Sequence, residues 1–223
     1  MRLLRISAMA VGLAALVSQS GAAQEGRQFK DAWFWGAKAG MLSYASATTT
    51  NGGAPLVGGE WLITRTNGGL YVSYDQAFFN TFGGFVDRDP DSVFVRNVKI
   101  KNMRRFTMAG MAFPWQSNKL HPYVGLGLSF NQIAGTSLVG SFVNSTRQAI
   151  AVDSVQSKKT GVSPIFIAGV QARYNPASLF IQSTVSPIQS SFFLANPTSS
   201  QSFNFSLEVG VRYNVGSSID RAR

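Results

Sequence analysis

Residues 202–216, SFNFSLEVGVRYNVG, decide the fold. From Phe203 to Val215 every second residue is apolar, and the residues between them are small, polar or charged. This alternation covers about thirteen positions, whereas an ordinary globular strand has about 5–6 residues. A strand that crosses a membrane in a barrel needs about 9–11 residues. The stretch therefore predicts a long strand with one face toward lipid and the other toward a barrel lumen.

The same period of two recurs in seven earlier stretches, at residues 33–44, 57–65, 70–75, 105–112, 124–131, 166–174 and 179–185. Short turns near 67–69, 115–122 and 175–178 alternate with long connections over roughly 45–55, 78–95, 134–160 and 187–201. Short turns on one side and long loops on the other are typical of outer-membrane barrels. We therefore predict an all-β, antiparallel, up-and-down transmembrane barrel with short periplasmic turns and long extracellular loops. Eight strands fit best, and ten are the alternative.

The N-terminal segment is typical of a secretory signal peptide. Arg2 and Arg5 precede an apolar run, and small residues follow at 20–23. This order predicts cleavage after Ala23, with Ala22 as the second choice, and export from the cytoplasm. A buried N-terminal helix is the alternative. The predicted organisation is a signal peptide at 1–23, a barrel domain at 24–216 and a short tail at 217–223.

Composition excludes several classes of protein. The chain has 223 residues, of which 45% are hydrophobic and 13% charged, so it is too apolar for a disordered protein. It has no cysteine, which excludes disulfides and thiolate metal sites. With a single histidine, we expect no metal site and no cofactor.

Charged residues on the polar faces of the strands are expected to fill the lumen: Lys38, Glu60, Asp75, Arg105, Arg173, Glu208 and Arg212. Unpaired charges in a narrow barrel would be costly, so these residues should form ion pairs. We expect Lys38 to pair with Glu60 or Glu208. Aromatic residues at strand ends are expected to form a girdle at the periplasmic side: Trp33, Trp35, Trp115, Tyr174 and Tyr213.

Several segments resemble the small eight-stranded outer-membrane barrels of the OmpX and OmpA transmembrane-domain type. They are FWGAKAGMLSY, HPYVGLGLSF, SPIFIAGVQARYNPASLFIQ and FNFSLEVGVRYNV, in addition to the signal peptide. The resemblance implies a monomeric barrel in the outer membrane of a Gram-negative bacterium, assisted by periplasmic chaperones and the barrel-insertion machinery. Many such barrels end in an aromatic residue, whereas here Gly216–Arg223 follow Val215.

Candidate chemistry is sparse. His121 could act as a general base only with a nearby serine and a carboxylate, and its predicted place at a periplasmic turn favours a structural role. Gly125 and Gly127 fit a narrow lumen better than a nucleotide loop. The alternating Asp87, Asp89 and Asp91 lack the spacing of a calcium loop. We therefore predict no catalytic residues and no enzyme.

A basic run, Arg96, Lys99, Lys101, Arg104 and Arg105, lies where the fourth strand would leave the outer leaflet. An exported protein does not ordinarily meet nucleic acid, and lipopolysaccharide phosphates are the more plausible partner. Period two places Arg96 and Arg104 on the outward face, and Lys99, Lys101 and Arg105 on the other. Arg96 and Arg104 are the candidate lipopolysaccharide contacts, and a solvated strand extension is the alternative.

The sequence therefore favours a structural or surface-interaction barrel whose lumen is filled by an ion-pair network. Three alternatives stay open: an outer-membrane lipid-modifying enzyme, a small passive pore, and a soluble periplasmic carrier resembling a lipocalin.

Overall fold

The chain folds as a closed antiparallel barrel in which each of eight strands pairs with the next and β8 pairs with β1. We analysed a computed structural model that describes residues 29–46, 49–89, 92–114, 117, 119–140, 142, 144–188, 192–194 and 202–217. The strands are β1 (Ala32–Ser46), β2 (Thr49–Thr64), β3 (Gly68–Asp89), β4 (Ser92–Ala112), β5 (Leu120–Leu138), β6 (Thr160–Tyr174), β7 (Ala177–Ile188) and β8 (Ser202–Ser217). The predicted fold class and strand number are confirmed. The predicted signal peptide, and all of the predicted tail except Ser217, lie outside the described residues.

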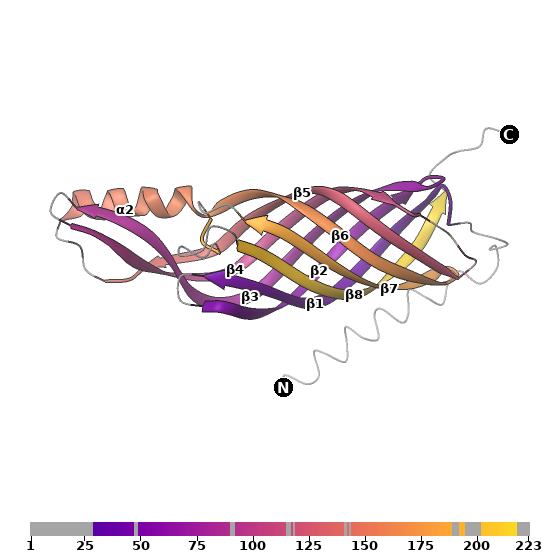
Figure 1. Ribbon diagram of the computed structural model, residues 1–223, viewed down its shortest axis with the longest axis horizontal. Helices are drawn as coiled ribbons and strands as arrows, with labels where there is room; N and C mark the ends of the chain where they lie inside the picture. Colours follow the sequence, from indigo (N-terminus) through magenta and orange to yellow (C-terminus); the bar gives the residue numbers. More distant parts are fainter. Residues whose placement is uncertain are drawn as a thin grey trace.

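The two ends of the barrel differ, as Figure 1 shows. Short turns join β2 to β3, β4 to β5 and β6 to β7 at one end, here called the turn end, where Ala32 of β1 also pairs with Ser217 of β8. At the opposite end, here called the α2 end, β3 and β4 project beyond the barrel, and helix α2 (Ser145–Ser157) lies beside them.

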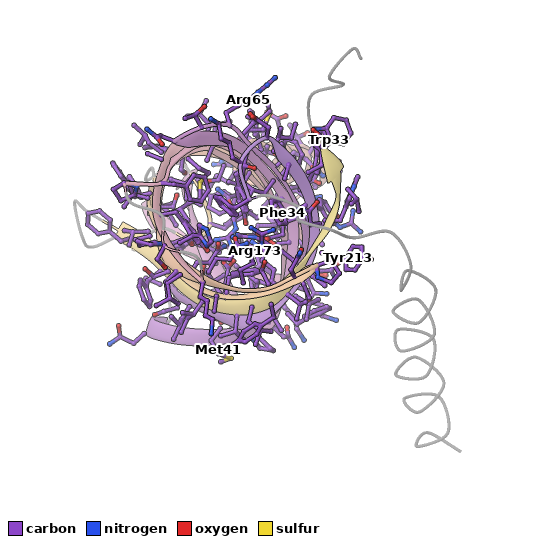
Figure 2. The ribbon with its side chains drawn as sticks, turned by 90° about the vertical axis from the view of Figure 1, so that its right-hand side faces the viewer. Trp33, Phe34, Met41, Arg65, Arg173 and Tyr213 are labelled. Atoms are coloured by element: carbon purple, nitrogen blue, oxygen red, sulfur yellow. The ribbon has the colours of Figure 1, made fainter. Side chains whose placement is uncertain are left out.

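Side chains alternate between the lumen and the outer surface along every strand. The apolar faces predicted to meet lipid are exposed: Leu126 is 59% exposed, Val209 52% and Leu207 47%. Viewed from the turn end, Phe34 and Arg173 lie within the ring of strands, whereas Trp33, Met41 and Tyr213 lie outside it (Figure 2). Trp33, Trp35 and Tyr174 of the predicted aromatic girdle are exposed near this end, and Trp115 lies outside the described residues.

Two of the long connections contain more secondary structure than predicted. Most of the stretch 78–95 is not a loop, because β3 and β4 stay paired to the very tip, where Asp89 lies opposite Ser92. This two-stranded ribbon extends beyond the neighbouring strands, because the last residue of β3 that pairs with β2 is Ala77 and the first residue of β4 that pairs with β5 is Val98. The predicted loop at 134–160 includes the end of β5 and helix α2. Asn144 caps the N-terminus of this helix, because its side chain accepts a hydrogen bond from the Arg147 amide (2.9 Å). No helix among the described residues is long and apolar enough to cross a membrane.

A β-bulge changes which face part of β4 presents. The β3–β4 register shifts between Ala77 and Asn80, and Asn102 opposite has a left-handed backbone with φ 54°. Asparagine tolerates this conformation better than most residues. Period two holds on either side of the bulge but with opposite phase, so Val98 and Ile100 are buried and Lys101 is exposed. The predicted facing of Lys99 and Lys101 with Arg105 is therefore wrong.

Candidate functional site: a charged layer in the lumen

A layer of buried polar side chains crosses the lumen, and every strand contributes to it. The members are Lys38 (β1), Glu60 (β2), Tyr71 and Asp75 (β3), Arg105 (β4), Tyr123 (β5), Gln171 (β6), Gln182 (β7), and Glu208 and Arg212 (β8). None of these residues is more than 5% exposed. Because the strands are regular here, period two alone directs these side chains inward.

One half of the layer is built around Glu208. Its carboxylate accepts hydrogen bonds from Lys38 Nζ (2.7 Å), Arg105 Nη2 (2.6 Å), Gln182 Nε2 (2.9 Å) and Ser206 Oγ (2.6 Å). Asp75 is the second anion of this half, at 3.0 Å from both Lys38 Nζ and Arg105 Nη2. Two cations therefore share two carboxylates in a closed ring of ion pairs.

The other half is built around Arg212. Its guanidinium donates to Glu60 through Nε, to Gln171 Oε1 through Nη1 (2.7 Å), and lies 4.0 Å from the centre of the Phe180 ring. Tyr71 joins the two halves, because its hydroxyl donates to Glu60 Oε2 (3.0 Å) and accepts from Lys38 Nζ (2.9 Å). The layer is thus one continuous network.

The layer is electrically balanced. It holds three cations, Lys38, Arg105 and Arg212, and three carboxylates, Glu60, Asp75 and Glu208. Each of these six side chains is at most 4% exposed. A buried ion is costly unless it is paired and hydrogen-bonded, and here each one has at least one opposite partner. At this level the lumen is occupied by bonded side chains.

Apolar side chains enclose the charged layer on both sides. Toward the α2 end lie Leu42, Leu56, Ile100 and Met103, together with Phe192, Phe193 and Leu194 from the β7–β8 connection. Phe193 fits against Gly83, where an added Cβ would come within 2.6 Å of its ring. Toward the turn end lie Phe34, Leu62, Met111 and Phe113, and Phe29 packs against Phe113 with ring centroids 4.9 Å apart.

Six of the seven charged residues expected in the lumen meet in this network. Lys38 binds Glu208 rather than Glu60, which pairs with Arg212 instead. Arg173 lies apart, near the turn end, where its Nη2 is 3.5 Å from Asn175 Oδ1. The neutral members were not predicted as site residues: Tyr71, Tyr123, Gln171 and Gln182. Three of them, Tyr71, Gln171 and Gln182, nevertheless lie on strand faces that were predicted to point toward the lumen.

The other candidates have structural surroundings. His121 is not in a turn but in β5, buried and stacked on Phe29 at 4.1 Å between ring centroids. An added Cβ on Gly127 would lie 2.0 Å from the Met108 carbonyl oxygen, so the barrel wall there requires glycine. Within the described ranges, no three His, Cys, Asp or Glu side chains lie close enough together to hold a metal ion. Asp91 lies outside the described residues.

The two candidate lipopolysaccharide contacts lie in different environments. Arg104 is exposed on the outer wall. Arg96 lies beyond the Asn102 bulge, and its guanidinium carbon is 4.4 Å from the centre of the Phe142 ring. The expectation that Arg96 and Arg104 share one face is therefore wrong, because the extra residue in the β3–β4 ladder reverses the alternation.

Several solved structures have a similar fold. The chain is similar to Neisserial surface protein A (NspA), at 14% identity and a TM-score of 0.54, over 81% of this chain and 96% of that one. It also matches the attachment invasion locus protein Ail of Yersinia pestis (9%, TM-score 0.48, 83% and 99% covered) and the N-terminal barrel domain of Pseudomonas aeruginosa OprF (13%, 0.40, 83% and 100%). No family model matches, and no curated protein matches by sequence. The likeness to NspA confirms the small outer-membrane barrel fold.

Proposed function

We propose that the chain is a bacterial outer-membrane barrel with a sealed lumen and a structural or surface-interaction role. The observation that carries this proposal is the charged layer in the lumen, which has no net charge and is enclosed by apolar side chains on both sides. Its turns face the periplasm, and the β3–β4 ribbon and α2 face the outside. The N-terminal segment is a signal peptide cleaved after Ala23. Chaperones and the barrel-insertion machinery deliver the chain, which works as a monomer.

The outward apolar band supports a membrane location over a soluble carrier. Leu126, Val124 and Phe166 are each more than half exposed, and similar residues continue around the barrel. A contiguous apolar surface of this kind aggregates in water but is stable in lipid. A soluble lipocalin-like carrier needs the opposite arrangement, with polar side chains on the outside.

Two other functions of this fold, a lipid-modifying enzyme and a passive pore, fit the geometry less well. A lipid-modifying enzyme needs a nucleophile, a base and an orienting carboxylate, and His121 is instead packed against Phe29. A passive pore needs a continuous water path, which the bonded layer would interrupt. Because His121 is packed in this way, lipid A from cells with and without the protein should give the same mass profile.

Conductance across a planar bilayer tests the sealed lumen. The full chain, checked for folding by a heat-modifiability gel, should give no stable current steps. The matched variant is Arg212→Ala, which removes a fully buried arginine side chain from the layer and should raise the frequency of current steps. Stable steps from the parent protein would contradict the proposal.

A further inference from the structure

The outer wall of the barrel changes from apolar to polar within one step on four neighbouring strands. One row pairs in register from β3 to β6 and is apolar: Tyr74, Phe106, Phe130 and Val162. The next outward row toward the α2 end is polar: Gln76, Arg104, Gln132 and Thr160. On β4, β5 and β6 this change marks the level at which the strands leave the hydrocarbon, whereas on β3 exposed Phe78 and Phe82 follow Gln76.

A groove lies at this boundary. It encloses about 340 Å³ between the aromatic side chains of Tyr74, Phe106 and Phe130 and the polar side chains of Arg104, Gln132 and Thr160. The Phe106 and Phe130 ring centroids are 6.3 Å apart. The groove is therefore amphipathic, with apolar walls toward the membrane core and a guanidinium at its outer edge.

The Asn102 bulge adds two further cations to the same face. Beyond it, Lys101 pairs in register with Asn80 and Gly135, and Lys99 pairs with Phe82 and Ser137. Because the alternation reverses at the bulge, both lysines lie on the outer wall, on the same side of the sheet as Arg104. Uninterrupted alternation would have directed them inward, among the apolar side chains of the α2-end cluster.

The ion pairs that the described residues form leave these three cations out. Among the residues that the structure describes, no carboxylate forms an ion pair with Lys99, Lys101 or Arg104. The buried carboxylates Glu60, Asp75 and Glu208 all point into the lumen. Three positive charges in a row above an aromatic groove are complementary to a group that is anionic outside and apolar inside.

We propose that this groove binds a phosphorylated glycolipid of the lipid A class in the outer leaflet. Arg104 binds a phosphate bidentately, Lys101 and Lys99 contact further anionic groups, and the first acyl carbons lie against Phe106 and Phe130. A guanidinium suits the planar, bidentate contact, whereas an ammonium acts as a point charge. This inference deepens the proposed function by naming a lipid partner, and it rests on the same orientation in the outer membrane.

Native mass spectrometry of the full chain, folded in detergent and titrated with bisphosphorylated lipid A, tests the proposal. The apparent Kd should be about tenfold lower than for dephosphorylated lipid A, which corresponds to about 1.4 kcal/mol. Arg104→Gln should weaken binding about tenfold, since charge-assisted hydrogen bonds are lost. Lys101→Gln should weaken it less. Lys119→Gln removes an exposed charge at the turn end and is the matched control, with parental affinity expected.

Three further arms make each outcome decisive. The affinity of Arg104→Lys for lipid A should lie between the affinities of the parent and of Arg104→Gln. If Arg104→Gln does not fold, the affinities of Arg104→Lys and Lys101→Gln test the proposal instead. Inorganic phosphate at the lipid concentration should not displace lipid A, because it lacks the acyl chains. The proposal would be overturned if the parent bound phosphatidylglycerol or dephosphorylated lipid A as tightly as bisphosphorylated lipid A. It would also be overturned if Arg104→Gln bound bisphosphorylated lipid A as tightly as the parent does. A barrel that conducts but keeps these affinities would contradict only the sealed lumen.

Discussion

Neutralising Glu208 is expected to destabilise the barrel strongly, because this carboxylate is the centre of one half of the charged layer. Glu208→Gln keeps the size of the side chain but leaves three cations facing two carboxylates. Four hydrogen bonds end on the Glu208 carboxylate, and two of them come from Lys38 and Arg105. Removing one partner of a buried ion pair costs about 3–5 kcal/mol, since the remaining charge stays buried. We expect a loss of this size in the free energy of unfolding.

Urea unfolding of the protein in lipid vesicles measures this loss. Asp153→Asn makes the same chemical change on an exposed residue of α2 and should shift the free energy of unfolding by less than about 0.5 kcal/mol. The double variant Lys38→Met with Glu208→Gln restores charge balance and should lose less than the sum of the two single losses. A loss below about 1 kcal/mol for Glu208→Gln, or strict additivity in the double variant, would refute the reasoning.

Two further predictions concern the barrel wall. Leu207→Arg should lower the free energy of unfolding in a bilayer by about 2–4 kcal/mol, as expected for a residue near the midplane. Val215 lies two residues from the end of β8, and Val215→Arg should lower it by only about 0–1 kcal/mol. Equal losses for the two variants in vesicle unfolding would contradict the depth assigned to Leu207. Gly127→Val should prevent folding, because its Cβ would meet the Met108 carbonyl oxygen at 2.0 Å, whereas Gly59→Val should be tolerated, with 3.8 Å to the nearest atom. A heat-modifiability gel compares the folded fractions of these two glycine variants, and a folded Gly127→Val barrel would show that the wall can yield.

Period two was enough to assign most of the fold and of the charged layer. A strand in a closed barrel has only two environments, so the face of Lys38 or Glu208 follows from its apolar neighbours in sequence. The pairing of Lys38 with Glu208 and Asp75 needed the register, and the neutral residues Tyr71 and Gln182 gave no signal because a polar residue on a lumen face is unremarkable in itself.

The predictions are wrong where the alternation changes phase or is hidden by composition. A single extra residue opposite Asn102 reverses the facing of Lys99 and Lys101, and no periodicity within β4 alone announces it. The projecting part of β3 and β4 is rich in Gly, Asn and Asp, which favour loops by composition, yet the two strands form a paired ribbon. Helix α2 buries little more than Ala151 and Val155, so its apolar pattern is weak.

The charged layer also bears on how the strands find one register. Because side chains alternate, a slip of one residue in β1, β2, β3, β4 or β8 would move a charged residue of the layer from the lumen to the lipid face. A charge at the centre of the bilayer costs about 2.5–3.5 kcal/mol, and the slip would also leave its partner buried and unpaired. If apolar residues replaced an ion pair, they would fill the same space, but a slipped pairing would then carry no such penalty. We infer that the six charges act less as a source of stability than as a device that holds the five strands carrying them, β1 to β4 and β8, in a single register.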